Sequence, residues 1–216
     1  MAGRVDAVIV TLDAPGIQAA AAAVAAGQCI VLPTDTVYGI GADATSPAAV
    51  QRLLDAKQRG RDMPPPILLP DADLLAEVAA DVPAAAFALA KAFWPGALTL
   101  ILKAKLPLDL GDRPTTIAVR VPDHDGARAL LRATGLLAVS SANISGEAPA
   151  TTVKQAQAML GETVAVYLDG GPTPGDTPST IVDATSEPPR IVRHGAIPAA
   201  SLRDIWPSIE DGAPGA

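Results

Sequence analysis

The stretch Cys29-Ile30-Val31-Leu32-Pro33-Thr34-Asp35-Thr36-Val37-Tyr38-Gly39-Ile40-Gly41 joins an apolar run to a cluster of polar side chains. The apolar run, residues 29–32, predicts a buried strand. Hydroxyl and carboxylate side chains follow where that strand must end, and Gly39 and Gly41 allow tight turning and close backbone approach. Polar groups at the end of a buried strand are a common way for an α/β sheet to build a ligand site. A capped turn between a strand and a helix explains the same residues, so this stretch alone leaves both interpretations open.

Outside this stretch, predicted strands and helices alternate irregularly. Ser46-Pro47 is typical of an N-cap followed by proline at the first helical position. Irregular alternation favours a mixed, twisted sheet covered by helices over a regular parallel barrel. We expect one domain over residues 1–206 and a disordered tail over residues 207–216. The expected helices are 15–27, 47–57, 71–79, 83–93, 124–133, 151–160 and 199–205, and the expected strands are 28–32, 67–69, 98–102, 116–121, 136–140, 164–168, 179–182 and 190–193.

Composition excludes several classes of protein. Apolar residues make up 49% of the 216 residues but aromatic residues only 3%, which predicts a core of Ala, Val, Leu and Ile. The lone cysteine, Cys29, is expected in the core and leaves no disulfide or Cys-rich metal site. No run approaches 18 apolar residues, so we expect no membrane span and, by elimination, a cytoplasmic location. A net charge of −7 disfavours broad, non-specific nucleic-acid binding.

A basic cluster, Lys57, Arg59 and Arg61, therefore stands out in a chain with only 16 Lys and Arg. Lys57 falls near the end of a predicted helix, where the helix dipole favours cations, so a solvated helix end is one interpretation. The proline-rich loop that follows, residues 59–66, stiffens the segment. A guanidinium fork beside an ammonium suits a polyphosphate, and we predict phosphate binding by Lys57 and Arg59.

Other polar residues also accompany predicted strands. Ser140-Ser141-Ala142-Asn143 follows an apolar strand and forms either a capped turn or a set of hydrogen-bonding groups. Arg120 lies in a β pattern in which it shares one face with Thr116. A buried arginine needs an anionic partner, which is either a structural Asp or a substrate carboxylate. Ser179 and Arg193 belong to the last two predicted strands.

Several common catalytic patterns are missing from the sequence. There is no Gly-x-x-x-x-Gly-Lys-Ser/Thr phosphate loop, no Gly-x-Gly-x-x-Gly fingerprint and no Gly-x-Ser-x-Gly nucleophile elbow. The two histidines, His124 and His194, are isolated, and no metal site is predicted. Conventional hydrolase and dehydrogenase functions are therefore disfavoured.

Seven short motifs, each modest alone, occur in order along residues 15–205. They are Pro33-Thr34-Asp35-Thr36-Val37-Tyr38-Gly39, Lys57-Gln58-Arg59, Trp94-Pro95-Gly96-Ala97-Leu98-Thr99, Val119-Arg120-Val121-Pro122, Ser140-Ser141-Ala142-Asn143, Ser179-Thr180-Ile181-Val182 and Arg193-His194-Gly195. The ordered set resembles the YrdC-like family of threonylcarbamoyl-AMP synthases, in its short, single-domain form. The resemblance implies an α/β fold with a mixed twisted sheet and a large concave, basic cavity.

The resemblance also implies a reaction. Threonylcarbamoyl-AMP and pyrophosphate would be made from L-threonine, bicarbonate or CO2, and ATP, with Mg2+ accompanying the ATP. A downstream tRNA threonylcarbamoyl-transferase complex would pass the group to adenosine 37 of tRNA, so contact with tRNA would be indirect. Carried over by position, the implied roles are catalysis and phosphate binding for Lys57 and Arg59, L-threonine binding for Thr34, Arg120 and Ser179, and nucleotide binding for Thr116, Ser141, Asn143 and Arg193.

Three positions depart from some relatives: Met63, Leu68 and Pro149 stand where Asn, His and Ser occur. We expect all three on loops that close over the ligands. Two alternatives stay open. One is a non-catalytic paralogue that binds nucleotide or RNA, and the other is carbamoyl-adenylate chemistry on a different acceptor, as in larger maturation proteins with a related domain.

Overall fold

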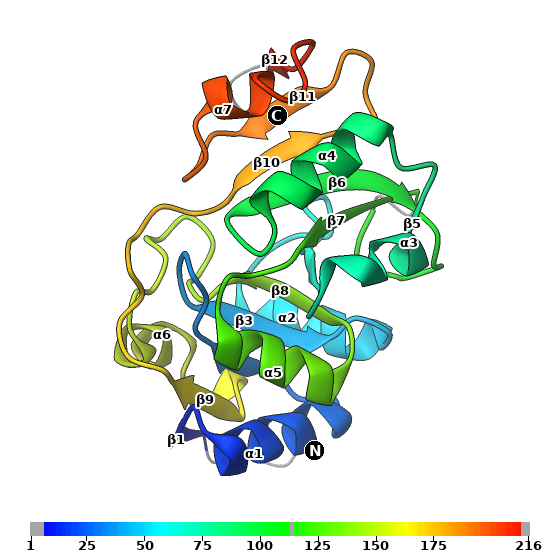
Figure 1. Cartoon of the computed structure of the whole chain (residues 1–216). Coiled ribbons are helices and arrows are strands. Elements are labelled where there is room, and N and C mark those ends of the chain that lie inside the picture. Colours follow the sequence, from blue (N-terminus) through cyan, green and yellow to red (C-terminus); the bar gives the residue numbers. More distant parts are fainter. Residues whose placement is uncertain (1–6, 113–114, 213–216) are drawn as a thin grey trace.

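The computed structural model describes residues 7–112 and 115–212. Within these ranges, twelve strands form one continuous sheet in the order β1-β9-β2-β3-β8-β4-β7-β6-β10-β11-β12, with β5 paired to β6 (Figure 1). The strands are β1 (Val8–Thr11), β2 (Ile30–Leu32), β3 (Gly39–Asp43), β4 (Ile67–Leu68), β5 (Ala79–Ala80), β6 (Leu98–Ala104), β7 (Thr116–Arg120), β8 (Leu137–Ser141), β9 (Val166–Asp169), β10 (Thr180–Asp183), β11 (Arg190–Arg193) and β12 (Glu210–Asp211).

Parallel and antiparallel pairs both occur, so the predicted mixed sheet is confirmed. For example, β4 pairs with β7 in parallel and with β8 antiparallel. The predicted helices are largely confirmed too, and Ser46 caps α2 by accepting a hydrogen bond from the Ala49 N–H at 3.3 Å. The helices are α1 (Ala14–Ala25), α2 (Pro47–Ala56), α3 (Leu75–Val78), α4 (Ala84–Phe93), α5 (Asp125–Thr134), α6 (Val153–Leu160) and α7 (Ala199–Arg203).

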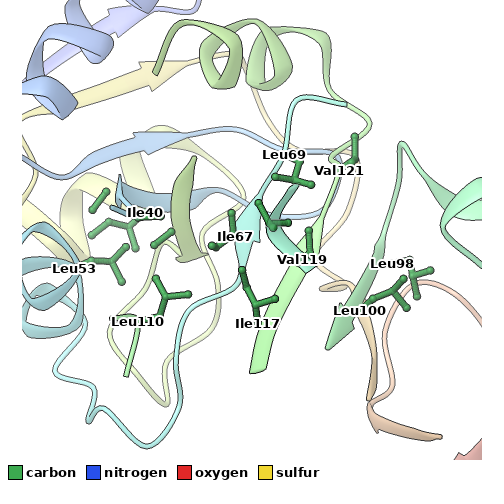
Figure 2. Close-up of a cluster of buried hydrophobic side chains, with 14 of the residues drawn as sticks. Ile40, Leu53, Ile67, Leu69, Leu98, Leu100, Leu110, Ile117, Val119 and Val121 are labelled. Carbon is green, nitrogen blue, oxygen red and sulfur yellow. The ribbon is translucent and has the colours of Figure 1, made fainter. Parts of the chain in front are cut away.

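The helices cover the two faces of the sheet unequally. Helices α1 and α5 lie side by side over one face of the β9-β2-β3-β8 half (Figure 1), where they share an apolar cluster with Leu137 and Leu168. Helices α2, α4 and α6 contribute to the other cluster, which is larger and includes Cys29, the residue expected in the core. Figure 2 shows part of this larger cluster, including Leu100 of β6 and Val119 of β7.

The half formed by β6, β7 and β10 has one buried face and one more exposed face. Leu98, Leu100 and Leu102 of β6 are buried, and they share their face with Ile117 and Val119. The intervening residues lie on the opposite face. Thr99 and Arg120 are buried there, whereas Ile101, Lys103, Thr116, Ala118, Ile181 and Asp183 are half-buried or exposed.

Strand β3 was not predicted, because glycines 39 and 41 were expected to form a turn. They lie instead in a buried strand that pairs antiparallel with β2 and β8, so residues 33–38 link two strands rather than a strand and a helix. A Cβ atom at Gly39 would lie 2.6 Å from Cγ1 of Val139. The Val139 side chain therefore packs closely against Gly39, whereas the expected tight turn at the glycines is wrong.

Other differences are local. Residues 71–79, expected as one helix, form a 3-10 turn followed by the four-residue α3, and strands β1, β5 and β12 were not predicted. In the expected tail, Ile209 is buried and β12 pairs with β11, while residues 213–216 lie outside the described residues. In the residues described, no helix is long and apolar enough to cross a membrane.

We expect Gly39→Ala to lower the free energy of unfolding by about 1–3 kcal/mol, because the new methyl group would overlap the Val139 side chain. Urea unfolding measures this loss. Gly175→Ala is the matched control, since a Cβ there meets nothing within 4 Å. Adding Val139→Ala to Gly39→Ala removes the overlapping atom. If the double variant lost more free energy of unfolding than the two single variants lose in sum, the packing explanation would be wrong.

Candidate functional site

The turn between β2 and β3 is fixed by the hydroxyl of Thr34. This buried hydroxyl donates to the Val37 carbonyl at 2.7 Å, accepts from the Thr36 N–H at 3.1 Å and lies 3.0 Å from Thr36 Oγ1. The Thr34 hydroxyl is therefore fully engaged within the turn. The same bonds fix the position of the intervening residue, Asp35, which projects from the turn toward β7.

Arg120, at the end of β7, meets this turn. Its Nη2 donates to Asp35 Oδ1 at 2.6 Å, its Nη1 donates to Thr36 Oγ1 at 2.9 Å, and its Nε donates to the Gly96 carbonyl at 2.9 Å. Burial lowers the pKa of Arg120, and the charge of Asp35 opposes that shift. The anionic partner that the sequence required is thus present in the protein itself, as Asp35.

Lys57 follows α2 and is almost completely buried, with 2% of its surface exposed. Its Nζ donates to the Ser141 carbonyl at 2.6 Å and to the Asn143 carbonyl at 2.8 Å, and Asn143 Oδ1 lies 3.5 Å away. Burial and the neighbouring Arg59 lower the pKa of Lys57 to about 8. A solvated helix end is therefore excluded, and Lys57 fastens the segment after β8 to the end of α2.

Arg59 is half-buried, and not all of its N–H donors have a partner among the described residues. Its Nη1 donates to Ser140 Oγ at 3.2 Å, while its Nε is buried and has no hydrogen-bond partner among the described residues. Burial lowers its pKa. Arg61 behaves differently, because it binds Gln51 and forms ion pairs with Asp109 and Asp112. Arg59 is therefore the member of the basic cluster that can donate to a ligand, and Arg61 ties two loops together.

A third polar group connects β6, β10 and β11. The Ser179 hydroxyl lies 2.9 Å from Thr99 Oγ1 and accepts from Arg193 Nη2 at 2.9 Å, and the Ser179 carbonyl accepts from Arg193 Nε and Nη2. Arg193 is exposed at the surface, yet desolvation by neighbouring atoms lowers its pKa. Thr99 was present in a quoted motif but had no predicted role.

Three guanidinium groups lie in the same region of the molecule. The charges of Arg120 and Arg59 lower the pKa of Arg193 further, so side chains from β7, the 59–66 loop and β11 lie within electrostatic range of one another. The fold thus gathers most of the predicted site residues, namely Thr34, Lys57, Arg59, Arg120, Ser141, Asn143, Ser179 and Arg193. Such a concentration of positive charge favours an anionic ligand.

Thr116 stands apart from this group. It shares the more exposed face of β7 with Arg120, about 13 Å farther along the strand. It lines a hollow of about 650 Å³ with Lys103 and Thr185. A second hollow, of about 670 Å³, lies near Asp71 and Leu136. Neither hollow includes Lys57, Arg59, Arg120 or Arg193, so the large basic cavity stays a prediction.

Leu68 corrects one expectation from the sequence. It does not lie on a loop but in β4, where it pairs with Arg120 and Leu137 and is 3% exposed. Its apolar side chain packs against the cluster under α1 and α5. Met63 and Pro149 do lie in loops, as expected.

Comparisons with known proteins find relatives that match most of this chain. A Sua5/YciO/YrdC family model described as "Telomere recombination" matches residues 22–195. A putative threonylcarbamoyl-AMP synthase of Mycobacterium tuberculosis is 47% identical over 88% of this chain and 88% of that protein. The threonylcarbamoyl-AMP synthase of Bacillus subtilis is 39% identical over 88% of this chain and 56% of its own length. The structure of Pyrococcus abyssi Sua5 complexed with L-threonine has a TM-score of 0.87 and 32% identity, covering 95% of this chain and 62% of the archaeal one.

The lowered pKa of Lys57 makes stability depend on pH. Between the folded-state pKa of about 8 and the ordinary value of 10.5, the unfolded chain binds more protons than the folded protein. The free energy of unfolding therefore rises with pH across this window. Relative to Lys57→Met, we expect the wild type to gain up to about 3 kcal/mol over this range in urea unfolding. Lys91→Met, which removes an exposed lysine, is the control, and a constant difference between wild type and Lys57→Met would contradict the assignment.

Proposed function

Because this chain belongs to the Sua5/YciO/YrdC family, we propose that it makes threonylcarbamoyl-AMP and pyrophosphate from L-threonine, bicarbonate or CO2, and ATP. The observation that carries the proposal is that Arg59, Arg120 and Arg193 lie within electrostatic range of one another in the region of the Asp35 turn. A polyphosphate and an amino-acid carboxylate are the anions of this reaction. The names of the bacterial relatives and the threonine complex of the archaeal structure support the same assignment.

The reaction needs two bond-forming steps. The threonine amine loses a proton and attacks CO2, which gives a carbamate. A carbamate oxygen then attacks the α-phosphorus of ATP, the bond from that phosphorus to the bridging oxygen breaks, and pyrophosphate leaves. Phosphoryl chemistry of this kind depends on positioning and charge neutralisation, and it requires no nucleophile from the protein.

Arg59 and Arg193 are the proposed phosphate ligands, since Arg59 is half-buried and binds only Ser140 through Nη1 among the described residues, and Arg193 is exposed. Lys57 adds positive charge near the phosphates, although its Nζ also fastens the segment from Ser141 to Asn143. That segment, together with Thr116, is proposed to bind the nucleotide.

Arg120 is proposed to bind the threonine carboxylate, with Thr34 and Ser179 beside it. Because the hydroxyls of Thr34 and Ser179 already have partners in the protein, their contacts with threonine would share those bonds.

Magnesium would come with the ATP rather than in a protein cage. No group of three or more His, Cys, Asp or Glu side chains that could hold a metal occurs in the described part of the chain. Mg2+ keeps several waters and binds substrate phosphates in many nucleotide enzymes. When bound, it would neutralise phosphate charge, while the arginines orient the phosphates.

The domain organisation, the downstream partner and the cellular location are also proposals. Residues 1–206 would form a single catalytic domain. The product would pass to a downstream tRNA threonylcarbamoyl-transferase complex, and the protein would work in the cytoplasm with only indirect contact to tRNA.

The test of this function is pyrophosphate release by the purified protein from ATP. We expect release only when L-threonine and bicarbonate are both present. Release that requires carbamoyl phosphate instead would indicate a different acceptor. Tight ATP or RNA binding without release would indicate a binding paralogue, and either result rejects the proposal.

Removal of the site cations should slow the reaction. We expect Arg59→Ala and Lys57→Ala each to lower turnover by about 100-fold or more, because charge on the reacting phosphate would lack compensation. Arg132→Ala is the control, since this exposed arginine of α5 pairs with Asp71 away from the site. Near-normal turnover of both site variants would remove these residues from the mechanism.

A further inference from the structure

Asp35 is the acidic member of the arginine-rich site. Its carboxylate lies beside the Arg120 guanidinium, with Oδ1 accepting from Nη2 at 2.6 Å. The Asp35 side chain is 14% exposed and that of Arg120 is 8% exposed. The pair is therefore nearly buried, with a small part of each side chain still exposed.

Both partners keep bonding capacity for a ligand. A guanidinium has five N–H donors. The contacts of Arg120 to Gly96, Thr36 and Asp35 use three of them. Among the residues that the structure describes, Asp35 is bonded only through Oδ1, which leaves Oδ2 without a hydrogen-bond donor. A ligand can therefore add one acceptor to Arg120 and one donor to Asp35.

A free α-amino acid has the matching arrangement of charges. Its carboxylate and its ammonium are attached to the same carbon, so a neighbouring cation and anion in the protein can bind both groups at once. A ligand that carried only a carboxylate would satisfy Arg120 and leave Asp35 Oδ2 unpaired, which costs free energy in a nearly buried site.

We propose that Asp35 binds the α-amino group of the amino-acid substrate and so selects free amino acids over carboxylic acids that lack the amine. This inference rests on the proposed function, in which Arg120 binds the substrate carboxylate. Asp35 accepts a hydrogen bond from the amino group, and the Thr34–Thr36 turn holds it in place. The amine thus stays next to Arg120, in the region that also holds Arg59 and Arg193.

Two ligands separate this role from a purely structural one. L-threonine carries the amine, whereas (R)-3-hydroxybutanoate has the same carboxylate, hydroxyl and methyl groups without it. We expect Asp35→Asn to weaken L-threonine binding by about tenfold or more, because a charge-assisted hydrogen bond is lost. The dissociation constant of (R)-3-hydroxybutanoate should change by less than about twofold, which is the size of change that a substitution away from the bound groups produces. Ligand-observed NMR measures both affinities without turnover.

Arg120→Ala is the matched variant, and it should weaken both ligands because it removes the carboxylate partner. Equal loss of both ligands in Asp35→Asn would overturn the proposal, since Asp35 would then act only by positioning Arg120. Unchanged or tighter threonine binding would also overturn it, because Asp35 would then compete with the substrate carboxylate.

Two further outcomes, a variant that does not fold and a wild type that does not bind, also lead to a decision. If Asp35→Asn does not fold, Asp35→Glu, which keeps the charge but moves it by one methylene, should weaken L-threonine binding more than (R)-3-hydroxybutanoate binding, and equal loss of both ligands would overturn the proposal. Failure of the wild type to bind L-threonine at all would reject the proposed function itself.

Discussion

The structure depends on holding several cations, Lys57, Arg59, Arg120 and Arg193, in one region. Burying or crowding like charges is costly unless each one has acceptors. Here the acceptors are mostly main-chain carbonyls at strand ends: Ser141 and Asn143 bind Lys57, Ser179 binds Arg193, and Gly96 binds Arg120. These carbonyls lie at or next to the ends of β6, β8 and β10, strands that also contribute to the core. The charges of Arg59 and Arg120 still act on Arg193, and an anionic ligand would offset this repulsion.

The unequal covering of the sheet explains why the site lies where it does. Residues of β6 and β7 that face α4 are apolar and buried, whereas Thr116, Ala118 and Arg120 face the opposite side, where most residues are half-buried or exposed. On the other half of the sheet, α1 and α5 cover that same side, and Leu68 packs with them directly beside Arg120. The boundary between covered and more exposed sheet is therefore also the boundary between core and site.

Local sequence patterns predicted most helices and the mixed sheet, since capping residues and apolar runs act over short distances. They failed at β3, where glycine is normally a poor strand residue but here makes room for Val139 of a distant strand. The ordered motifs placed Arg120, Lys57 and Arg193 in one site. They did not reveal that Lys57 is buried against Ser141, or that Asp35 is the partner of Arg120, because both contacts join residues more than 80 positions apart. Thr99 was missed for the same reason, since its partner Ser179 lies on another strand.

The central claim is that Arg59 and Arg193 form a polyphosphate site beside Arg120. Calorimetric titration of inorganic tripolyphosphate into the wild type and into Arg193→Ala tests it without any requirement for catalysis. Arg193 suits this comparison because it is exposed and its removal leaves the core intact. We expect the wild type to bind with an affinity that falls as salt is added, and Arg193→Ala to bind about tenfold more weakly or worse. Equal affinities of the two proteins, or an absence of binding to the wild type, would contradict the claim.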